Sequence, residues 1–302
     1  MDARQESSAT AEANGSIHPD TSLGAVRLNV ADLQRMSSFY ERAVGLPVIE
    51  STADTVRLGV DGKASVELVG RPDAPIRPPR TTGLFHLAVL VPSRIELARA
   101  IRRVVDADRS FTGASDHLVS EAMYLDDPEG NGIEIYRDRP REGWRRSPDG
   151  DLAMATLPLD VDSVIGELGG SPDPAPVAAP ATHIGHVHLQ VSDIDEAEAF
   201  YSRILGFDVT VRGYPGALFV SAGGYHHHLG LNTWAGRGAP PPLAGARGLD
   251  WFEIVLPDDS ELDLIESRLE SGDVKATRHA GGLLVTDPSE NRIFLGPVSS
   301  AK

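Results

Sequence analysis

The stretch GHVHLQVSD at residues 185–193 decides the fold of this 302-residue chain, because it matches GAVRLNVAD at residues 24–32 without a gap. The same offset of 161 residues (185 minus 24) holds downstream, where Phe39-Tyr40 matches Phe200-Tyr201. An internal repeat of this length indicates duplicated structural units that pack against one another.

A second, looser match joins residues 85–92 to residues 250–257, and Asp127-Pro128 to Asp287-Pro288. Each of the four openings alternates apolar residues at a period of two and then leads into a helical pattern. We therefore expect an α+β protein of four modules, each with about one helix and four strands. The modules span residues 23–70, 83–137, 182–232 and 248–296.

The regions outside the modules complete the predicted organisation. Residues 1–22 are expected to form a disordered tail, because their composition is polar and lacks periodicity. The modules then group into an N-terminal domain (23–137) and a C-terminal domain (182–298). The linker between them, residues 138–181, holds a short helical pattern at 162–168 and a Pro/Ala-rich spacer. So long a connection lets the modules pair in more than one order.

Composition narrows the function classes. The net charge is −16 with no long Lys/Arg run, so nucleic acid and anionic membranes are unsuitable partners. The chain has no cysteine, which excludes disulfides, thiolate metal sites and cysteine nucleophiles. No signal peptide and no apolar run of about 20 residues is evident. These features predict a cytoplasmic enzyme.

The four βαβββ modules, with GHVHLQVSDIDEAEAFYSRILGF and DDPEGNGIEIY, resemble the vicinal oxygen chelate superfamily. The resemblance covers residues 23 to 296 and implies the glyoxalase/bleomycin resistance/dihydroxybiphenyl dioxygenase fold, in which paired modules curl into half-open barrels, two in this chain. It also implies that metal ligands come from one position on the first strand and one on the last strand of each module. Membership alone does not give the reaction.

Carrying these ligand positions over by resemblance leaves one complete set. The first-strand positions are Ala25, His86, His186 and Trp251. The last-strand positions are Glu67, Glu134, a site near Gly230, and Phe294. The second and third modules together would supply His86, His186 and Glu134, which is the facial triad of non-haem Fe(II) oxygenases, although Mn(II) has the same ligand preferences. We therefore hypothesise that module two pairs with module three, and that modules one and four are a vestigial pair in which Glu67 is structural.

Residues 116–134, DHLVSEAMYLDDPEGNGIE, resemble the extradiol dioxygenase signature, with one flanking departure at Ser115. A strand, a Gly-rich hairpin and a return strand would bring His117, Tyr124 and Glu134 to one barrel interior. The resemblance implies that Tyr124 hydrogen-bonds a substrate oxygen and that His117 stabilises or protonates the oxygen-derived intermediate. The alternative for Tyr124 is a core aromatic residue with a satisfied hydroxyl.

Residues 223–234, GGYHHHLGLNTW, resemble the family segment that carries the acid/base histidine. Matching Gly230 to the small residue of that segment indicates His227 as the base, with His228 as the nearest alternative. Strand alternation would place His226 and His228 on the opposite face. A purification artefact or a surface metal patch is the competing interpretation of the three histidines.

The resemblance is closest to type I extradiol dioxygenases of the two-domain catechol 2,3-dioxygenase kind. It implies Fe(II)-dependent cleavage of a catechol-type diol with O2 to a semialdehyde muconate. One alternative is a glyoxalase-like lyase or isomerase with another divalent metal, and another is a metal-free drug-binding resistance protein of the same fold. Duplicated barrel proteins often assemble, so a homo-oligomer is one of the assembly states that the sequence leaves open.

Overall fold

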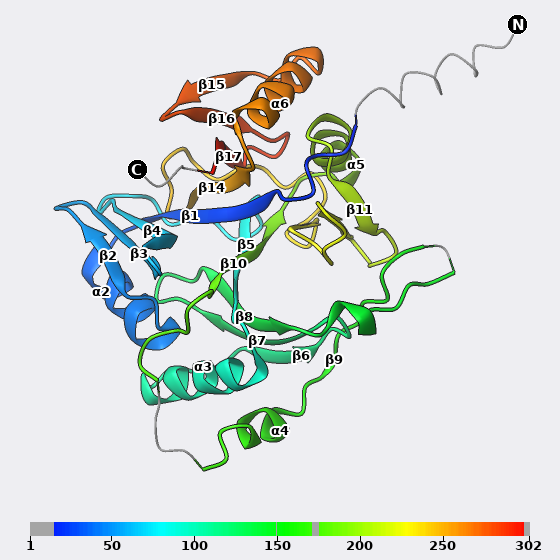
Figure 1. Ribbon diagram of the computed structural model, residues 1–302. Helices are drawn as coiled ribbons and strands as arrows, with labels where there is room; N and C mark the ends of the chain where they lie inside the picture. Colours follow the sequence, from blue (N-terminus) through cyan, green and yellow to red (C-terminus); the bar gives the residue numbers. More distant parts are fainter. Residues whose placement is uncertain (1–14, 149, 171–174, 299–302) are drawn as a thin grey trace, which may run out of the picture.

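The first and last modules of the chain form one sheet of eight strands (Figure 1). The computed structural model describes residues 15–148, 150–170 and 175–298. The first module contains β1 (Ser22–Val30), α2 (Leu33–Phe39), the π-helical turn η1 (Tyr40–Val44), β2 (Val48–Ser51), β3 (Thr55–Val60) and β4 (Lys63–Gly70). The fourth contains β14 (Gly248–Leu256), α6 (Asp259–Ser271), β15 (Ala276–His279), β16 (Gly282–Thr286) and β17 (Arg292–Pro297).

The two middle modules and part of the linker form a second sheet, of nine strands. The second module contains β5 (Gly83–Leu90), α3 (Arg94–Asp106), β6 (Gly113–Asp116), β7 (Ser120–Asp126) and β8 (Gly132–Asp138). The third contains β10 (His183–Gln190), α5 (Ile194–Glu198), the π-helical turn η3 (Ala199–Ile204), β11 (Asp208–Val211), β12 (Ala217–Ser221) and β13 (Leu229–Asn232). The linker adds the 3-10 turn η2 (Arg141–Gly143), β9 (Leu157–Pro158) and α4 (Val161–Gly166).

The first strands of the modules join the two halves of each sheet. β5 pairs antiparallel with β10, and β1 pairs antiparallel with β14. The strand orders are β15-β16-β17-β14-β1-β4-β3-β2 and β11-β12-β13-β10-β5-β8-β7-β6-β9. The α+β fold with two curled sheets and the pairing of module two with module three are therefore confirmed. Over the described residues, each sheet combines one module from the first half of the chain with one from the second half.

The repeated sequence features have identifiable structural functions. Asp32 and Asp193, at the end of the repeated stretch, cap helices α2 and α5 by accepting hydrogen bonds from backbone N–H groups of the first turn. Asp258 caps α6 in the same way. A continuous core includes one apolar residue from the first strand of each module, all 1% exposed or less: Leu28, Val89, Leu189 and Ile254.

Two equivalent hydrogen bonds lock neighbouring modules together. The hydroxyl of Tyr40 in module one donates to Asp127 of module two at 3.1 Å, and Tyr201 in module three donates to Asp287 of module four at 2.9 Å. All four side chains are buried. The repeated tyrosine and the repeated Asp-Pro turn are thus two ends of one contact, which is why both recur in the sequence.

The tail and the linker differ in part from the expectation. Residues 1–14 of the predicted disordered tail lie outside the described residues, but residues 15–22 are held on the protein by two buried side chains, Ile17 and Thr21, each 2% exposed. The N–H of Ile17 also donates to the Gly206 carbonyl. Burial of the apolar Ile17 side chain stabilises this part of the tail. The predicted short helix is α4, and the linker also contributes β9, which the sequence did not predict.

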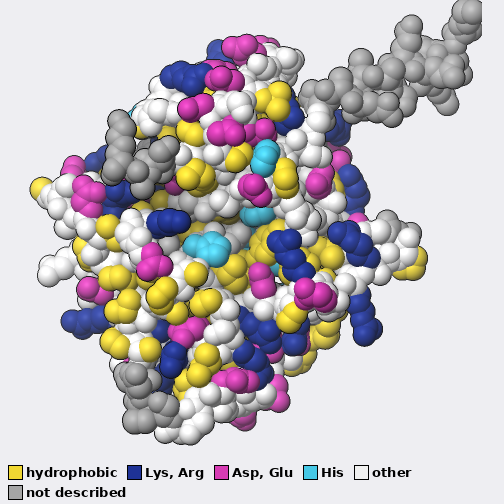
Figure 2. All heavy atoms as spheres, in the orientation of Figure 1, with side chains coloured by type: hydrophobic (Ala, Val, Ile, Leu, Met, Phe, Trp, Pro, Cys, Tyr) yellow, Lys and Arg dark blue, Asp and Glu magenta, His cyan; other side chains and the backbone are white. Residues whose placement is uncertain are grey.

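The described surface is consistent with the acidic composition. Figure 2 shows acidic and basic side chains interspersed over the face that it presents, with no continuous basic area. Among the described residues, no helix has both the length and the apolar composition needed to cross a bilayer.

Candidate metal centre and active site

Two histidines and one glutamate from three neighbouring strands meet at the centre of the nine-stranded sheet. His86 lies on β5, Glu134 on β8 and His186 on β10, and β5 runs between the other two strands. The buried Ala88 stands opposite both Glu134 and His186 in the register, so a small side chain occupies the position that the three polar groups surround. The ligand atoms of the three residues all lie within 4.8 Å of one another.

The distances within this cluster fit a shared divalent metal ion. Oε2 of Glu134 lies 3.1 Å from Nε2 of His86 and 3.2 Å from Nε2 of His186. Two donor atoms that each lie about 2.1 Å from a metal, at right angles, are separated by about 3.0 Å. Although Nε2 of His86 is buried and close to Glu134, it makes no aligned hydrogen bond. A metal ion would satisfy this nitrogen, whereas an isolated buried polar atom is unfavourable.

Burial also sets the charges that a cation needs. Desolvation lowers the pKa of His186 to about 4, so this imidazole is neutral near pH 7. Burial alone would raise the pKa of the Glu134 carboxyl, but His186 and His86 outweigh that effect and hold it well below its usual value. The Glu134 carboxylate and the neutral His186 imidazole therefore offer donors suited to a cation, in a site where the three residues are 6% exposed or less.

The cluster lies in the wall of a cavity of about 510 Å³. Beside this cluster, the indole of Trp234 packs edge-on against Phe85, with ring centroids 5.2 Å apart. The rings of Phe85 and His188 both contact the ring of His86, with centroids 5.2 and 4.9 Å from it. Figure 2 shows histidine side chains near the centre of one face, beside hydrophobic side chains. The remaining wall includes Phe219, Tyr214, Met154 and Thr156. The cavity can therefore take a flat, mainly apolar molecule that presents polar atoms to the ligand cluster.

His117 and Tyr124 face the same cavity and contact each other. Nε2 of His117 lies 2.6 Å from the Tyr124 hydroxyl, and Nδ1 lies 2.7 Å from the Ala155 carbonyl oxygen. Because a carbonyl only accepts, the proton of a neutral His117 is on Nδ1, and Tyr124 donates to Nε2. Burial, with Glu134 nearby, raises the pKa of Tyr124 well above its ordinary value, so the phenol keeps its proton. Tyr124 is thus a protonated donor beside the cluster of His86, Glu134 and His186.

The three consecutive histidines separate as strand alternation predicts. Of the three, His227 lines the cavity, with its ring 4.2 Å from that of His186. His228, the alternative base, does not line it: its Nδ1 accepts a hydrogen bond from the backbone N–H of Ala222 at 3.1 Å on the far side. His226 is fully buried and bridges His227 to Asp138, with distances of 2.8 and 2.9 Å.

Comparison with known proteins agrees with this architecture. The family model of the Glyoxalase/Bleomycin resistance protein/Dioxygenase superfamily matches residues 22–135 and 183–295. The chain belongs to this superfamily. It is 44% identical over 278 residues to a catechol-2,3-dioxygenase of Bacillus subtilis (strain 168), covering 90% of this chain and 96% of the relative. Similarity over nearly the full length of both chains identifies this member as an enzyme of the extradiol dioxygenase type.

Solved structures show the same superfamily fold at low identity. A candidate dioxygenase from Bacillus subtilis subsp. subtilis str. 168 aligns with a TM-score of 0.66 at 14% identity, over 96% of this chain and 87% of that chain. Glyoxalase I from Zea mays aligns with a TM-score of 0.57 at 13% identity, over 91% of this chain and 92% of that chain. These likenesses concern the fold alone.

The outer pair of modules in this superfamily member fills the equivalent place with an ion pair and aromatic rings. Arg27 pairs with Glu67 and lies 3.2 Å from Asp250, and its guanidinium lies over the Trp251 ring at 5.8 Å. Phe294 packs against Trp251 with ring centroids 5.7 Å apart. Glu67 therefore forms an ion pair with Arg27, which agrees with a structural role for this residue.

Sequence reasoning missed several parts of the site. The linker residues Met154, Ala155 and Thr156 line the cavity, although the linker was expected only to connect domains. Asp138 and its contact to His226 were also missed. No local signal marks these residues, because each acts through a partner that is distant in the sequence.

Proposed function

We propose that this enzyme cleaves the ring of a catechol-type aromatic diol with O2, beside the hydroxyl pair, to a semialdehyde muconate. Fe(II), with Mn(II) as the alternative of similar ligand preference, would be held by His86, Glu134 and His186. The observation that carries the proposal is that this three-ligand cluster, which leaves coordination positions open, shares one cavity with the His117–Tyr124 pair and His227.

The metal would supply the redox chemistry with O2 and lower the proton affinity of the diol oxygens. The side chains of this chain do the rest. Tyr124, kept protonated by burial, donates its one proton to His117 in this structure and would turn it toward a substrate oxygen to orient the bound ring. Once Tyr124 turns to the substrate, Nε2 of His117 would be free to take up a proton released by the diol and to return it to the oxygen-derived intermediate, while Nδ1–H stays on the Ala155 carbonyl.

His227 is the proposed general base, and its neighbours set its tautomer. Asp138 accepts from Nε2–H of His226, so Nδ1 of a neutral His226 is an acceptor. Nδ1–H of His227 then donates to it, which leaves Nε2 of His227 with a lone pair. Burial lowers the pKa of His227 well below its usual value, so the ring is neutral and able to take the diol proton.

The alternatives fit the cavity less well. A glyoxalase-like lyase or isomerase would need a carboxylate base at the substrate, and among the described residues lining the cavity Glu134 belongs to the ligand cluster and Asp126 is the other carboxylate. A metal-free drug-binding protein would use the aromatic wall of Phe85 and Trp234 but would leave Nε2 of His86 without a partner.

The test is direct. Protein loaded anaerobically with Fe(II) and then given catechol and air should turn yellow while O2 is consumed in equal amount to the diol. Glu134→Ala should lose iron, whereas Tyr124→Phe should keep iron and turn over more slowly, by about 10²- to 10⁴-fold. Absence of colour and O2 uptake with catechol, substituted catechols and hydroquinones would reject the dioxygenase proposal. Iron retained by Glu134→Ala would reject the ligand assignment.

A further inference from the structure

His117 is carried by a turn whose backbone needs external support. The turn joins β6 to β7, and within it Leu118 has a positive φ of 69°, a conformation that leucine rarely adopts. The side chain of Asp116 accepts a hydrogen bond from the N–H of Leu118 at 2.9 Å, and the N–H of His117 donates to the Ser120 carbonyl at 2.9 Å. These contacts hold the turn in the form that points His117 toward Tyr124.

The linker completes the support from the other side. β9 pairs with β6, which places Leu157 opposite Asp116 and Pro158 opposite Ser115. Directly before β9, the Ala155 carbonyl accepts the Nδ1 proton of His117 at 2.7 Å. The position of the linker therefore decides which nitrogen of His117 is protonated and which one faces Tyr124.

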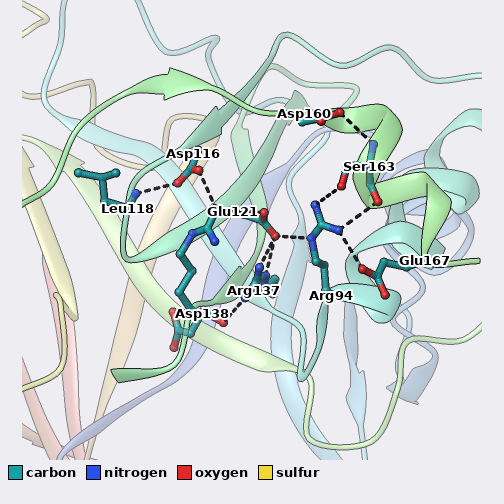
Figure 3. Close-up of polar contacts among 10 residues, drawn as sticks. Arg94, Asp116, Leu118, Glu121, Arg137, Asp138, Asp160, Ser163 and Glu167 are labelled. Atoms are coloured by element: carbon teal, nitrogen blue, oxygen red, sulfur yellow. Dashed lines mark hydrogen bonds and ion pairs between the residues drawn. The ribbon is translucent and has the colours of Figure 1, made fainter. Parts of the chain in front are cut away.

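The buried carboxylate of Glu121, on β7, connects the turn that carries His117 with the linker through arginine side chains (Figure 3). Glu121 is 3% exposed and contacts three arginines: Arg94 at 3.0 Å, Arg137 at 2.6 Å and Arg139 at 3.2 Å. Arg139 continues to the carboxylate of Asp116 at 2.7 Å, which is the group that holds the Leu118 N–H. Glu121 is thus connected to the turn that carries His117 through the single side chain of Arg139.

The same carboxylate reaches the linker through Arg94. The guanidinium of Arg94 donates to the Ser163 carbonyl at 3.0 Å and to Glu167 at 2.9 Å, and so fixes α4 against α3 (Figure 3). Asp160 caps α4 by accepting from the Ser163 N–H at 2.9 Å. Since α4 closely follows β9, anchoring α4 also anchors β9 and Ala155, which lies just before that strand.

We propose that Glu121 is a positioning residue for His117: through Arg139 and Asp116 it fixes the turn, and through Arg94 it fixes the linker whose carbonyl orients the imidazole. The linker is therefore part of the active site. This inference rests on the proposed function, in which His117 acts on the reacting oxygen. None of the charged groups in this network lines the metal cluster itself, so the network acts on His117 without changing the metal ligands.

The test combines Glu121→Gln with His117→Ala, with catechol as the substrate probe. Glu121→Gln should lower kcat by about tenfold to a hundredfold with bound iron per chain unchanged, because a small displacement of a reacting group is costly. In the His117→Ala background the same substitution should lower kcat less than twofold further, since it acts through the missing residue. Arg102→Gln is the matched control: it breaks an exposed pair with Asp106 on α3 and should change nothing.

A second readout does not depend on turnover. In protein labelled with ¹⁵N-histidine, the His117 signal, identified by its absence in His117→Ala, should show the Nδ1–H tautomer in the wild type and a mixture of tautomers in Glu121→Gln. If Glu121→Gln does not fold, Arg94→Gln, which leaves Glu121 paired with two arginines, is expected to give the same mixture. An unchanged tautomer, or an equal loss of kcat with and without His117, would overturn the inference. A wild type inactive on catechol with the expected tautomer shift would refute the proposed function alone.

Discussion

His228 should make the protein sensitive to acid, and the structure gives the size of the effect. Its Nδ1 accepts a hydrogen bond from the Ala222 N–H at 3.1 Å and lies 3.2 Å from the Ser221 hydroxyl, and its ring packs against Phe207 and Tyr225. Protonation of Nδ1 would make it a second donor facing the Ala222 N–H, in a buried environment without an acceptor between them. Burial lowers the pKa of His228 to about 3.

The sign follows from comparing the folded and unfolded states. An unfolded histidine has a pKa of about 6.5, so between pH 6.5 and pH 3 the unfolded chain binds a proton at His228 that the folded protein does not. The contribution of neutral His228 to the free energy of unfolding is therefore fully present above pH 6.5 and decreases as the pH falls below that value. At pH 5.0 the loss is about 1.5 pH units times 1.36 kcal/mol, or about 2 kcal/mol.

The assay is urea unfolding of metal-free wild type and His228→Asn at pH 7.5 and pH 5.0. Asparagine can accept from the Ala222 N–H through Oδ1 but does not titrate, so it isolates the proton. Chelation removes competition between protons and metal at the other histidines. Wild type should lose about 2 kcal/mol more than the variant on acidification. Equal losses in the two proteins would refute the reasoning.

Three further predictions concern the modules and the metal. Tyr40→Phe removes the buried donor to Asp127 and should lower the free energy of unfolding by about 1–3 kcal/mol in urea titrations; a change below about 0.5 kcal/mol would contradict the contact between modules. Chelating the metal should lower the unfolding temperature, because Glu134 is then a buried charge without its cation. Re-addition of Fe(II) at about 100 times its Kd should restore about 2.7 kcal/mol of the free energy of unfolding, and no shift in unfolding temperature would argue against a metal at this site. Gly132→Ala should reduce bound iron, because its methyl group would overlap the backbone carbonyl of Phe85 beside His86. The control Gly143→Ala, whose methyl group meets no atom within 4 Å, should bind iron normally, and equal iron in both variants would count against this strand geometry.

Much of the fold could be predicted because each module is encoded by patterns within its own short stretch of sequence. The period-two and helical patterns predicted modules at 23–70 and 83–137, close to the observed β1–β4 and β5–β8. Pairing of modules two and three could also be predicted, because only those modules carry ligand-type residues such as His86 and His186 at the first-strand position. The packed segment at Ile17 could not, since its partner Gly206 is distant in the chain.

Some features of the candidate site could likewise be predicted from the sequence, and others could not. The sequence by itself determined the residue types and spacing of the ligand cluster, of His117 and Tyr124, and of the three consecutive histidines, because strand alternation fixes which side chains share a face. Only the tertiary structure decided that Ala155 of the linker orients His117, and that Glu121 connects the linker to the turn. The physical reason is that hydrogen bonds and ion pairs between remote segments depend on how those segments pack, and no local pattern encodes that packing.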